Sequence, residues 1–183
     1  MLASISILGC GAVGTAVGRG LLTLGHEVIF YDIDEQTIEN LRSEGLRATL
    51  FIDETIKGSQ LSFVCVPTPT KRGRIDLSHV KAVVKDLARV LRQKDEYHLV
   101  VIKSTVTPTT TERNVIPWIE KYSGKKAGLH IGVCMNPEFM TEIHGTWTSD
   151  DSHARTFLNE PVIVIGEFDK KSGDLLQSIY EVL

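Results

Sequence analysis

The sequence ISILGCGAVG, residues 5–14, decides the fold class. It starts with a short apolar run that ends at a cluster of glycines, and the apolar residues after this cluster recur at helical spacing as far as Leu24. Glycines in the pattern G-x-G-x-x-G, between a strand and a helix, are typical of a turn that binds the phosphates of a dinucleotide. The hexapeptide alone is a weak signal, so its interpretation depends on the sequence around it.

Each glycine of the pattern has a separate physical role. Gly9 allows the tight turn, Gly11 lets a pyrophosphate approach the backbone, and Gly14 lets the helix pack closely on the strand. The first helical residues, Ala12 and Val13, then present free amide groups and a partial positive charge to the anion. We therefore expect these five residues to bind a cofactor.

Asp32 strengthens this interpretation, because it follows the next predicted strand, Val28–Tyr31, and lies 18 residues after Gly14. A carboxylate in this position can accept hydrogen bonds from both ribose hydroxyls and repels a 2'-phosphate. The spacing therefore favours NAD over NADP. In the alternative interpretation the glycines serve only tight packing and Asp32 caps the next helix, but Asp34 competes for that cap.

The rest of the chain alternates between apolar runs and amphipathic segments. We expect strands at residues 61–66, 99–102, 130–133 and 162–165. We expect helices at residues 35–44, 78–93 with Ser78 as N-cap, 109–122 and 170–182. This order predicts a Rossmann-type doubly wound α/β fold, a mostly parallel sheet with helices on both faces and its ligand loops along one edge. Residues 1–166 would form the domain and residues 167–183 the start of a connecting helix.

Composition excludes several classes of protein. The 183 residues are 42% apolar, enough for one core-bearing domain. A net charge of -3, without long blocks of either sign, argues against a nucleic-acid-binding face or a membrane anchor. Three widely spaced cysteines do not suggest a disulfide framework, and no histidine pairs with another ligand at metal-site spacing. We therefore expect a cytoplasmic protein without a metal site.

Three further segments lie at the predicted ligand edge, and they narrow the family. They are Cys65-Val66-Pro67-Thr68-Pro69-Thr70, Lys103-Ser104-Thr105-Val106-Thr107-Pro108 and Asn136-Pro137-Glu138-Phe139-Met140-Thr141-Glu142. Together with the glycine turn they resemble the N-terminal NAD-binding domain of the UDP-glucose/GDP-mannose dehydrogenase family, from Ile5 to about Glu142 and again from Phe157 to Gly166. The resemblance implies an enzyme that oxidises the primary alcohol of a nucleotide sugar to a carboxylate, by two hydride transfers to NAD through a cysteine thioester.

The resemblance also implies a role for individual residues. Ser104 would approach the cofactor, and the Thr105 hydroxyl would position a water or an alcohol. Glu138 would serve as a base in the hydrolytic step, and Glu142 would lie near the nicotinamide end of NAD. Residues Val66, Pro67 and Thr68 would form the wall beside the nicotinamide ribose. The alternative for these polar residues is loop capping and turn formation.

The main departure from the family pattern concerns the nucleophile. The family's nucleophilic cysteine belongs to a second domain, and none of Cys10, Cys65 and Cys134 occupies a matching position. With the chain ending at Leu183, we expect it to need that C-terminal domain or a second chain to oxidise a UDP- or GDP-linked hexose, with a homodimer as one option. The alternative is a standalone dinucleotide-binding module without turnover.

Overall fold

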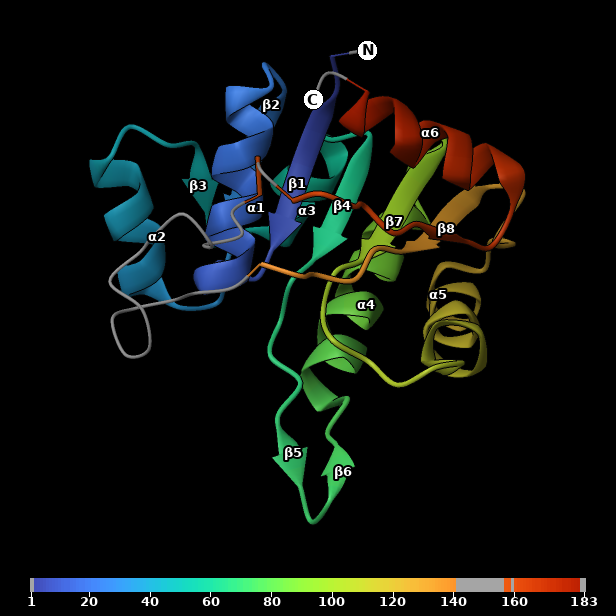
Figure 1. The fold of residues 1–183 in the computed structure, drawn as a ribbon. Coiled ribbons are helices and arrows are strands. Elements are labelled where there is room, and N and C mark those ends of the chain that lie inside the picture. The colour runs from blue at the N-terminus through green and yellow to red at the C-terminus, as the bar shows by residue number, and fades with distance from the viewer. Residues whose placement is uncertain (1, 141–156, 159, 182–183) are drawn as a thin grey trace.

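The computed structural model describes residues 2–140, 157–158 and 160–181. Its centre is a seven-stranded sheet in the order β3-β2-β1-β4-β7-β8-β9 (Figure 1). The strands of this sheet are β1 (Ser4–Leu8), β2 (Glu27–Tyr31), β3 (Ala48–Thr49), β4 (Leu61–Val64), β7 (His98–Ile102), β8 (Ile131–Met135) and β9 (Gly166–Glu167). All neighbouring pairs are parallel except β8 and β9, which are antiparallel. This is the strand order of a doubly wound dinucleotide-binding fold, as predicted.

Helices cover both faces of the sheet, which explains why its strands are apolar on both sides. The helices are α1 (Ala12–Thr23), α2 (Glu35–Ser43), α3 (Ile52–Lys57), α4 (Ser78–Leu91), α5 (Ile116–Ser123) and α6 (Lys170–Tyr180). In β4, Phe63 belongs to the core cluster that contains residues of α1, α2 and α6, whereas Val64 belongs to the cluster with α3, α4 and α5. Among the described residues, no helix is long and apolar enough to cross a bilayer.

One predicted strand and one predicted N-cap are wrong. Residues 162–165 do not form a strand, and pairing with the sheet starts only at β9. The carbonyl of Val164 instead accepts a hydrogen bond from the side chain of Asn136. Ser78 is not the N-cap of α4, because it is already the first helical residue. Its amide is satisfied by the side chain of Asp76, which accepts the hydrogen bond at 2.8 Å.

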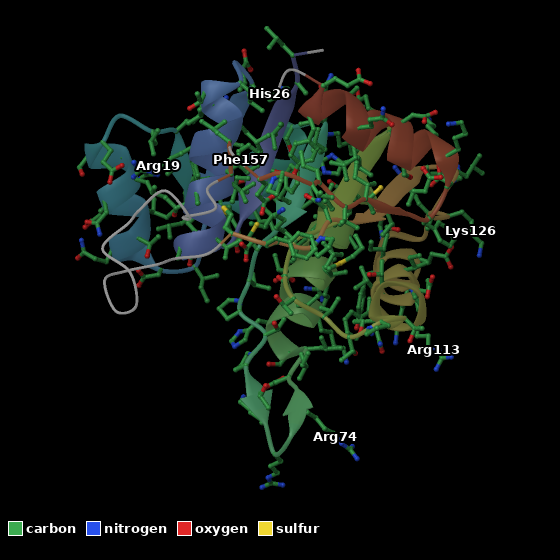
Figure 2. The ribbon with its side chains drawn as sticks, in the orientation of Figure 1. Arg19, His26, Arg74, Arg113, Lys126 and Phe157 are labelled. Carbon is green, nitrogen blue, oxygen red and sulfur yellow. The ribbon has the colours of Figure 1, made fainter. Side chains whose placement is uncertain are left out.

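The expected helix at 109–122 is divided into a π-helical turn (Thr111–Val115) and α5. The short elements β3 and α3 were not predicted, and neither was a hairpin of two two-residue strands, β5 (Thr70–Lys71) and β6 (Arg74–Ile75). Figure 1 shows this hairpin projecting from the body of the domain, and Figure 2 shows Arg74 pointing away from it.

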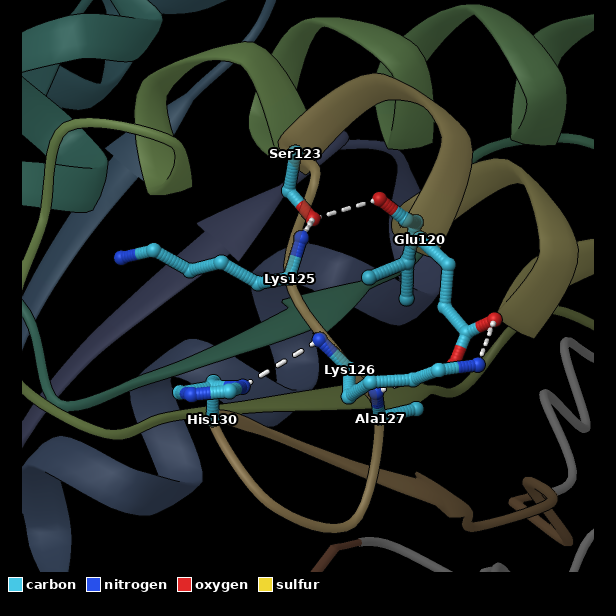
Figure 3. Close-up of polar contacts among 7 residues, drawn as sticks. Glu120, Ser123, Lys125, Lys126, Ala127 and His130 are labelled. Atoms are coloured by element: carbon cyan, nitrogen blue, oxygen red, sulfur yellow. Dashed lines mark hydrogen bonds and ion pairs between the residues drawn. The ribbon is translucent and has the colours of Figure 1, made fainter.

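The turn that returns the chain from α5 to β8 is held by side chains at the end of the helix (Figure 3). Ser123 Oγ donates to the carbonyl of Ile119 at 2.7 Å and accepts from the amide of Lys125 at 3.0 Å. Glu120 accepts from the amide of Ala127 and forms an ion pair with Lys126. These contacts set the start of β8, whose other end carries part of the candidate site.

A buried polar network crosses three central strands near their amino ends. Ser62 Oγ lies 2.6 Å from Ser6 Oγ and 2.7 Å from Nε2 of His98, while Lys94 Nζ lies 3.3 Å from the other ring nitrogen. Lys94 also donates to the backbone carbonyls of Ile56 and Ser59. Since His98 is fully buried, these bonds replace the water that its ring loses on folding.

Candidate dinucleotide and catalytic site

The glycine turn between β1 and α1 has the geometry that its sequence predicts. Gly9 has φ +98°, a left-handed conformation that favours glycine. A Cβ at Gly14 would lie 1.9 Å from the carbonyl oxygen of Gly9, so only glycine allows this approach of helix to turn. A Cβ at Gly11, in contrast, would meet nothing within 4 Å. The turn is therefore tight on the protein side and open where a pyrophosphate would rest.

Asp32 lies beside this turn at the end of β2. One carboxylate oxygen accepts from the amide of Cys10 at 2.6 Å, and the other accepts from the amide of Asp34 at 3.0 Å. Helix α2 is capped by Asp34, whose side chain accepts from the amide of Thr37 at 2.8 Å. The cap at Asp34 is thus confirmed, and Asp32 is fixed next to the glycine turn by two backbone amides.

A cavity of about 240 Å³ continues from the glycine turn along the carboxyl edge of the sheet. Its lining consists of Gly11, Ala12, Val13, Cys65, Val66, Pro67, Thr68, Lys103, Ser104, Thr105 and Glu138. The wall residues, the Ser-Thr pair and the glutamate that the resemblance singled out therefore line the same space as the glycine turn. Glu142 lies outside the described residues.

Hydrogen bonds hold the loops of this cavity together. Thr68 Oγ1 donates to the carbonyl of Thr105 at 2.7 Å, which joins the loops after β4 and β7. Ser104 is buried and its hydroxyl donates to the carbonyl of Val66 at 2.7 Å, so this hydroxyl shapes the wall. Thr105 is exposed and Glu138 is half-buried, and both line the cavity.

Sequence reasoning missed one residue of the site, Lys103. Lys103 lines the cavity although it is only 2% exposed. Burial lowers the pKa of its ammonium group, while the carboxylates of Glu160 and Glu138 and the thiol of Cys65 act in the opposite direction.

The cysteines are poor candidates for nucleophiles. Cys10, Cys65 and Cys134 are all buried and free. Burial raises the pKa of Cys65 to about 12, and it raises the pKa values of the other two thiols as well. They stay protonated at neutral pH, so they lack the thiolate that attacks carbon. In the described part of the chain, no group of three or more His, Cys, Asp or Glu side chains is placed to hold a metal ion.

The strand order, the glycine turn and the acid after β2 define a Rossmann-type dinucleotide-binding domain. Residues 40–183 match the model of the UDP-glucose/GDP-mannose dehydrogenase family, NAD binding domain. The chain belongs to this family, and the part of the family that it matches is the NAD binding domain. The match confirms the predicted family and the cofactor, NAD.

Individual relatives agree with the family model. The chain is 39% identical to a GDP-mannose 6-dehydrogenase of Pseudomonas syringae and 36% identical to a UDP-glucose 6-dehydrogenase of Haloferax volcanii; each alignment covers 98% of this chain and 44% of the relative. Among solved structures, a ternary complex of GDP-mannose dehydrogenase from Pseudomonas aeruginosa matches with a TM-score of 0.87 at 36% identity, over 98% of this chain and 44% of that one. The chain thus spans less than half the length of the relatives that it matches.

Proposed function

We propose that this chain holds NAD across the carboxyl edge of its sheet and presents the nicotinamide to the C6 alcohol of a nucleotide-linked hexose. The observation that carries the proposal is the cavity that joins the glycine turn to Thr105 and Glu138. One end of this space offers backbone amides to a diphosphate, and the other offers a hydroxyl and a carboxylate to a reacting alcohol.

The amides at the start of α1 bind the pyrophosphate, and Asp32 orients the adenosine ribose by accepting from its hydroxyls. NAD supplies the hydride acceptor when bound. The residues Val66, Pro67 and Thr68 form the wall that limits where the nicotinamide lies and excludes water from that side. Open space at Gly11 and an ordered carboxylate at Asp32 fit this ligand.

Thr105 and Glu138 carry the proton chemistry of the proposal. The exposed hydroxyl of Thr105 can accept from the substrate alcohol or from a water and donate in turn, which fixes the orientation of the reacting oxygen. The half-buried carboxylate of Glu138 holds the proton removed from that alcohol or from water in the hydrolytic half of the reaction. Glu142, from the same segment, is proposed to lie near the nicotinamide.

The remaining groups would come from outside this chain. Because Cys10, Cys65 and Cys134 are protonated and buried, the thioester nucleophile would be supplied by the part of the enzyme that corresponds to the other half of the relatives. Residues 1–166 would form the cofactor domain, and residues 167–183, with α6, would lead into that part. The substrate would be a GDP- or UDP-linked hexose, the two classes named for the relatives.

The test is NADH formation at 340 nm by the protein with GDP-mannose or UDP-glucose, with and without the part that the relatives have in addition. We expect turnover only with that part, two NADH per sugar consumed, and its loss in Thr105→Ala. The alternative, a dinucleotide-binding module without catalysis, predicts NAD binding but no NADH with either sugar, even in the complete protein.

A further inference from the structure

A buried side-chain network lies directly behind the cavity and involves three segments of the chain. Asn136, the first residue after β8, accepts with its Oδ1 from Lys103 Nζ at 3.2 Å and from the hydroxyl of Tyr180 at 2.6 Å. Its Nδ2 donates to the carbonyl of Val164 at 2.8 Å. Lys103, Asn136 and Tyr180 are all buried, so the network ties the ends of β7 and β8 to helix α6.

Charged side chains reach the peptide groups on both sides of Glu138, and one of them, Lys103, belongs to this network. Lys103 Nζ donates to the carbonyl of Pro137 at 3.3 Å, and the amide of Phe139 donates to the carboxylate of Glu160 at 3.1 Å. A charged group therefore holds the backbone immediately before Glu138, and another holds it immediately after. A hydrogen bond with one ionised partner is stronger than a neutral one, which suits a segment that must keep one geometry.

Lys103 also acts on Glu138 through its charge. An ammonium group next to a carboxylate favours the ionised form of that carboxylate, which is the form that accepts a proton. The same attraction acts in reverse, because the Glu138 carboxylate counteracts the effect of burial on the pKa of Lys103. The other ionisable groups facing Lys103 are Glu160 and Cys65.

We propose that Lys103 is a positioning residue, which fixes the Pro137–Glu138 turn at the cavity, and that Tyr180 connects helix α6 to this turn through Asn136. Movement of α6 would then be felt at Glu138 without any contact between the two. The part of this inference that concerns turnover rests on the proposed function, whereas the part that concerns the geometry of the turn does not.

The first experiment needs only this chain and measures amide hydrogen exchange at Glu138 and Phe139. Lys103→Met is expected to speed exchange at both amides by about tenfold or more, because the turn loses its hold on Pro137. Lys94→Met is the matched control, since Lys94 also donates to two backbone carbonyls but at the opposite edge of the sheet. Unchanged exchange in Lys103→Met, or equal acceleration in Lys94→Met, overturns the proposal.

Two milder variants keep the test decisive if Lys103→Met does not fold. Lys103→Arg retains the charge and is expected to restore part of the protection at Glu138 and Phe139. Tyr180→Phe removes one hydroxyl and is expected to speed exchange at the same two amides by about threefold. Exchange at these amides that is as slow in Tyr180→Phe as in the wild type shows that α6 is not connected to the turn.

The second experiment uses the complete enzyme under the proposed function. In Lys103→Met we expect kcat to fall at least tenfold and the acidic limb of the pH–rate profile to move to higher pH, with an unchanged KM for NAD and partial rescue by Lys103→Arg. An unchanged pH profile contradicts the positioning role. Absence of turnover in the wild type would contradict the proposed function, and the exchange experiment would still decide the role of Lys103.

Discussion

Lowering the pH should destabilise the domain through His98, at the edge of the sheet opposite the cavity. Its Nδ1 faces the ammonium group of Lys94, which can only donate, so Nδ1 accepts and the ring proton lies on Nε2, where it is donated to Ser62. Burial, and then the charge of Lys94, lower the pKa of His98 from 6.5 to about 3. The folded protein therefore keeps a neutral ring at pH values where the unfolded chain is protonated.

The pH dependence of the free energy of unfolding follows from the difference in bound protons between the folded and the unfolded state. Below pH 6.5 the unfolded chain binds a proton on His98 that the folded protein does not bind. The free energy of unfolding is therefore highest above pH 6.5 and decreases as the pH falls from 6.5 towards 3. One pH unit in this window changes the free energy of unfolding by about 1.4 kcal/mol, so lowering the pH to about 5 costs about 2 kcal/mol from His98 alone. For a domain of this size such a loss lowers Tm by roughly 4–8 °C.

The assay is urea unfolding of the wild type and of His98→Gln between about pH 8 and pH 4.5. Gln can still donate to Ser62 but does not titrate, so the difference between the two pH profiles isolates the histidine from the acidic residues. We expect the wild type to lose about 2.7 kcal/mol more than the variant over this range, since pH 4.5 lies two units below 6.5. Parallel profiles, or an NMR titration in which the His98 ring protonates near pH 6 in the folded protein, would refute the reasoning.

Three further predictions concern the cofactor site. Gly14→Ala should lower the free energy of unfolding by about 3 kcal/mol or more, since its Cβ would lie 1.9 Å from a backbone oxygen. Gly11→Val should keep a free energy of unfolding within about 1 kcal/mol of the wild type but lose NAD affinity more than tenfold. Equal melting curves for the two variants would contradict this. Asp32→Ala should weaken NAD by about 1.5–3 kcal/mol in a calorimetric titration, and an unchanged Kd would remove Asp32 from the site. Glu138→Gln should bind NAD like the wild type while NADH formation by the complete enzyme falls at least a hundredfold; a large loss of NAD affinity would mean that Glu138 contacts the cofactor.

Most of the fold follows from local patterns that tertiary contacts only refine. Apolar runs such as 5–8 and 99–102 are buried on both faces, and the glycine turn has a backbone that few other sequences allow. The wrong predictions concern segments where the local sequence pattern does not match the strand pairing in the structure. Residues 162–165 are apolar, yet the carbonyl of Val164 accepts its hydrogen bond from the side chain of Asn136 and not from a neighbouring strand. The hairpin at Thr70–Ile75 has strands too short to show alternation.

The candidate site was predicted from residues whose chemistry is visible in a motif, such as Asp32 and Glu138. Lys103 was not, although it belongs to one of the quoted motifs, because a lysine at the end of a strand is normally solvated. Lys103 is buried because the segments that follow β4, β7 and β8 lie close together. The pairing of these strands, which are distant in the sequence, brings those segments together. Such burial leaves no local signal in the sequence.

A calorimetric titration of this chain with NAD, and with NADP as comparator, tests the central claim most directly. Saturable binding of one NAD per chain is expected, with NADP at least tenfold weaker because its 2'-phosphate would meet the carboxylate of Asp32. If NAD produces no binding signal at millimolar concentration, or if both dinucleotides bind equally well, the glycine turn and Asp32 do not form the cofactor site described above.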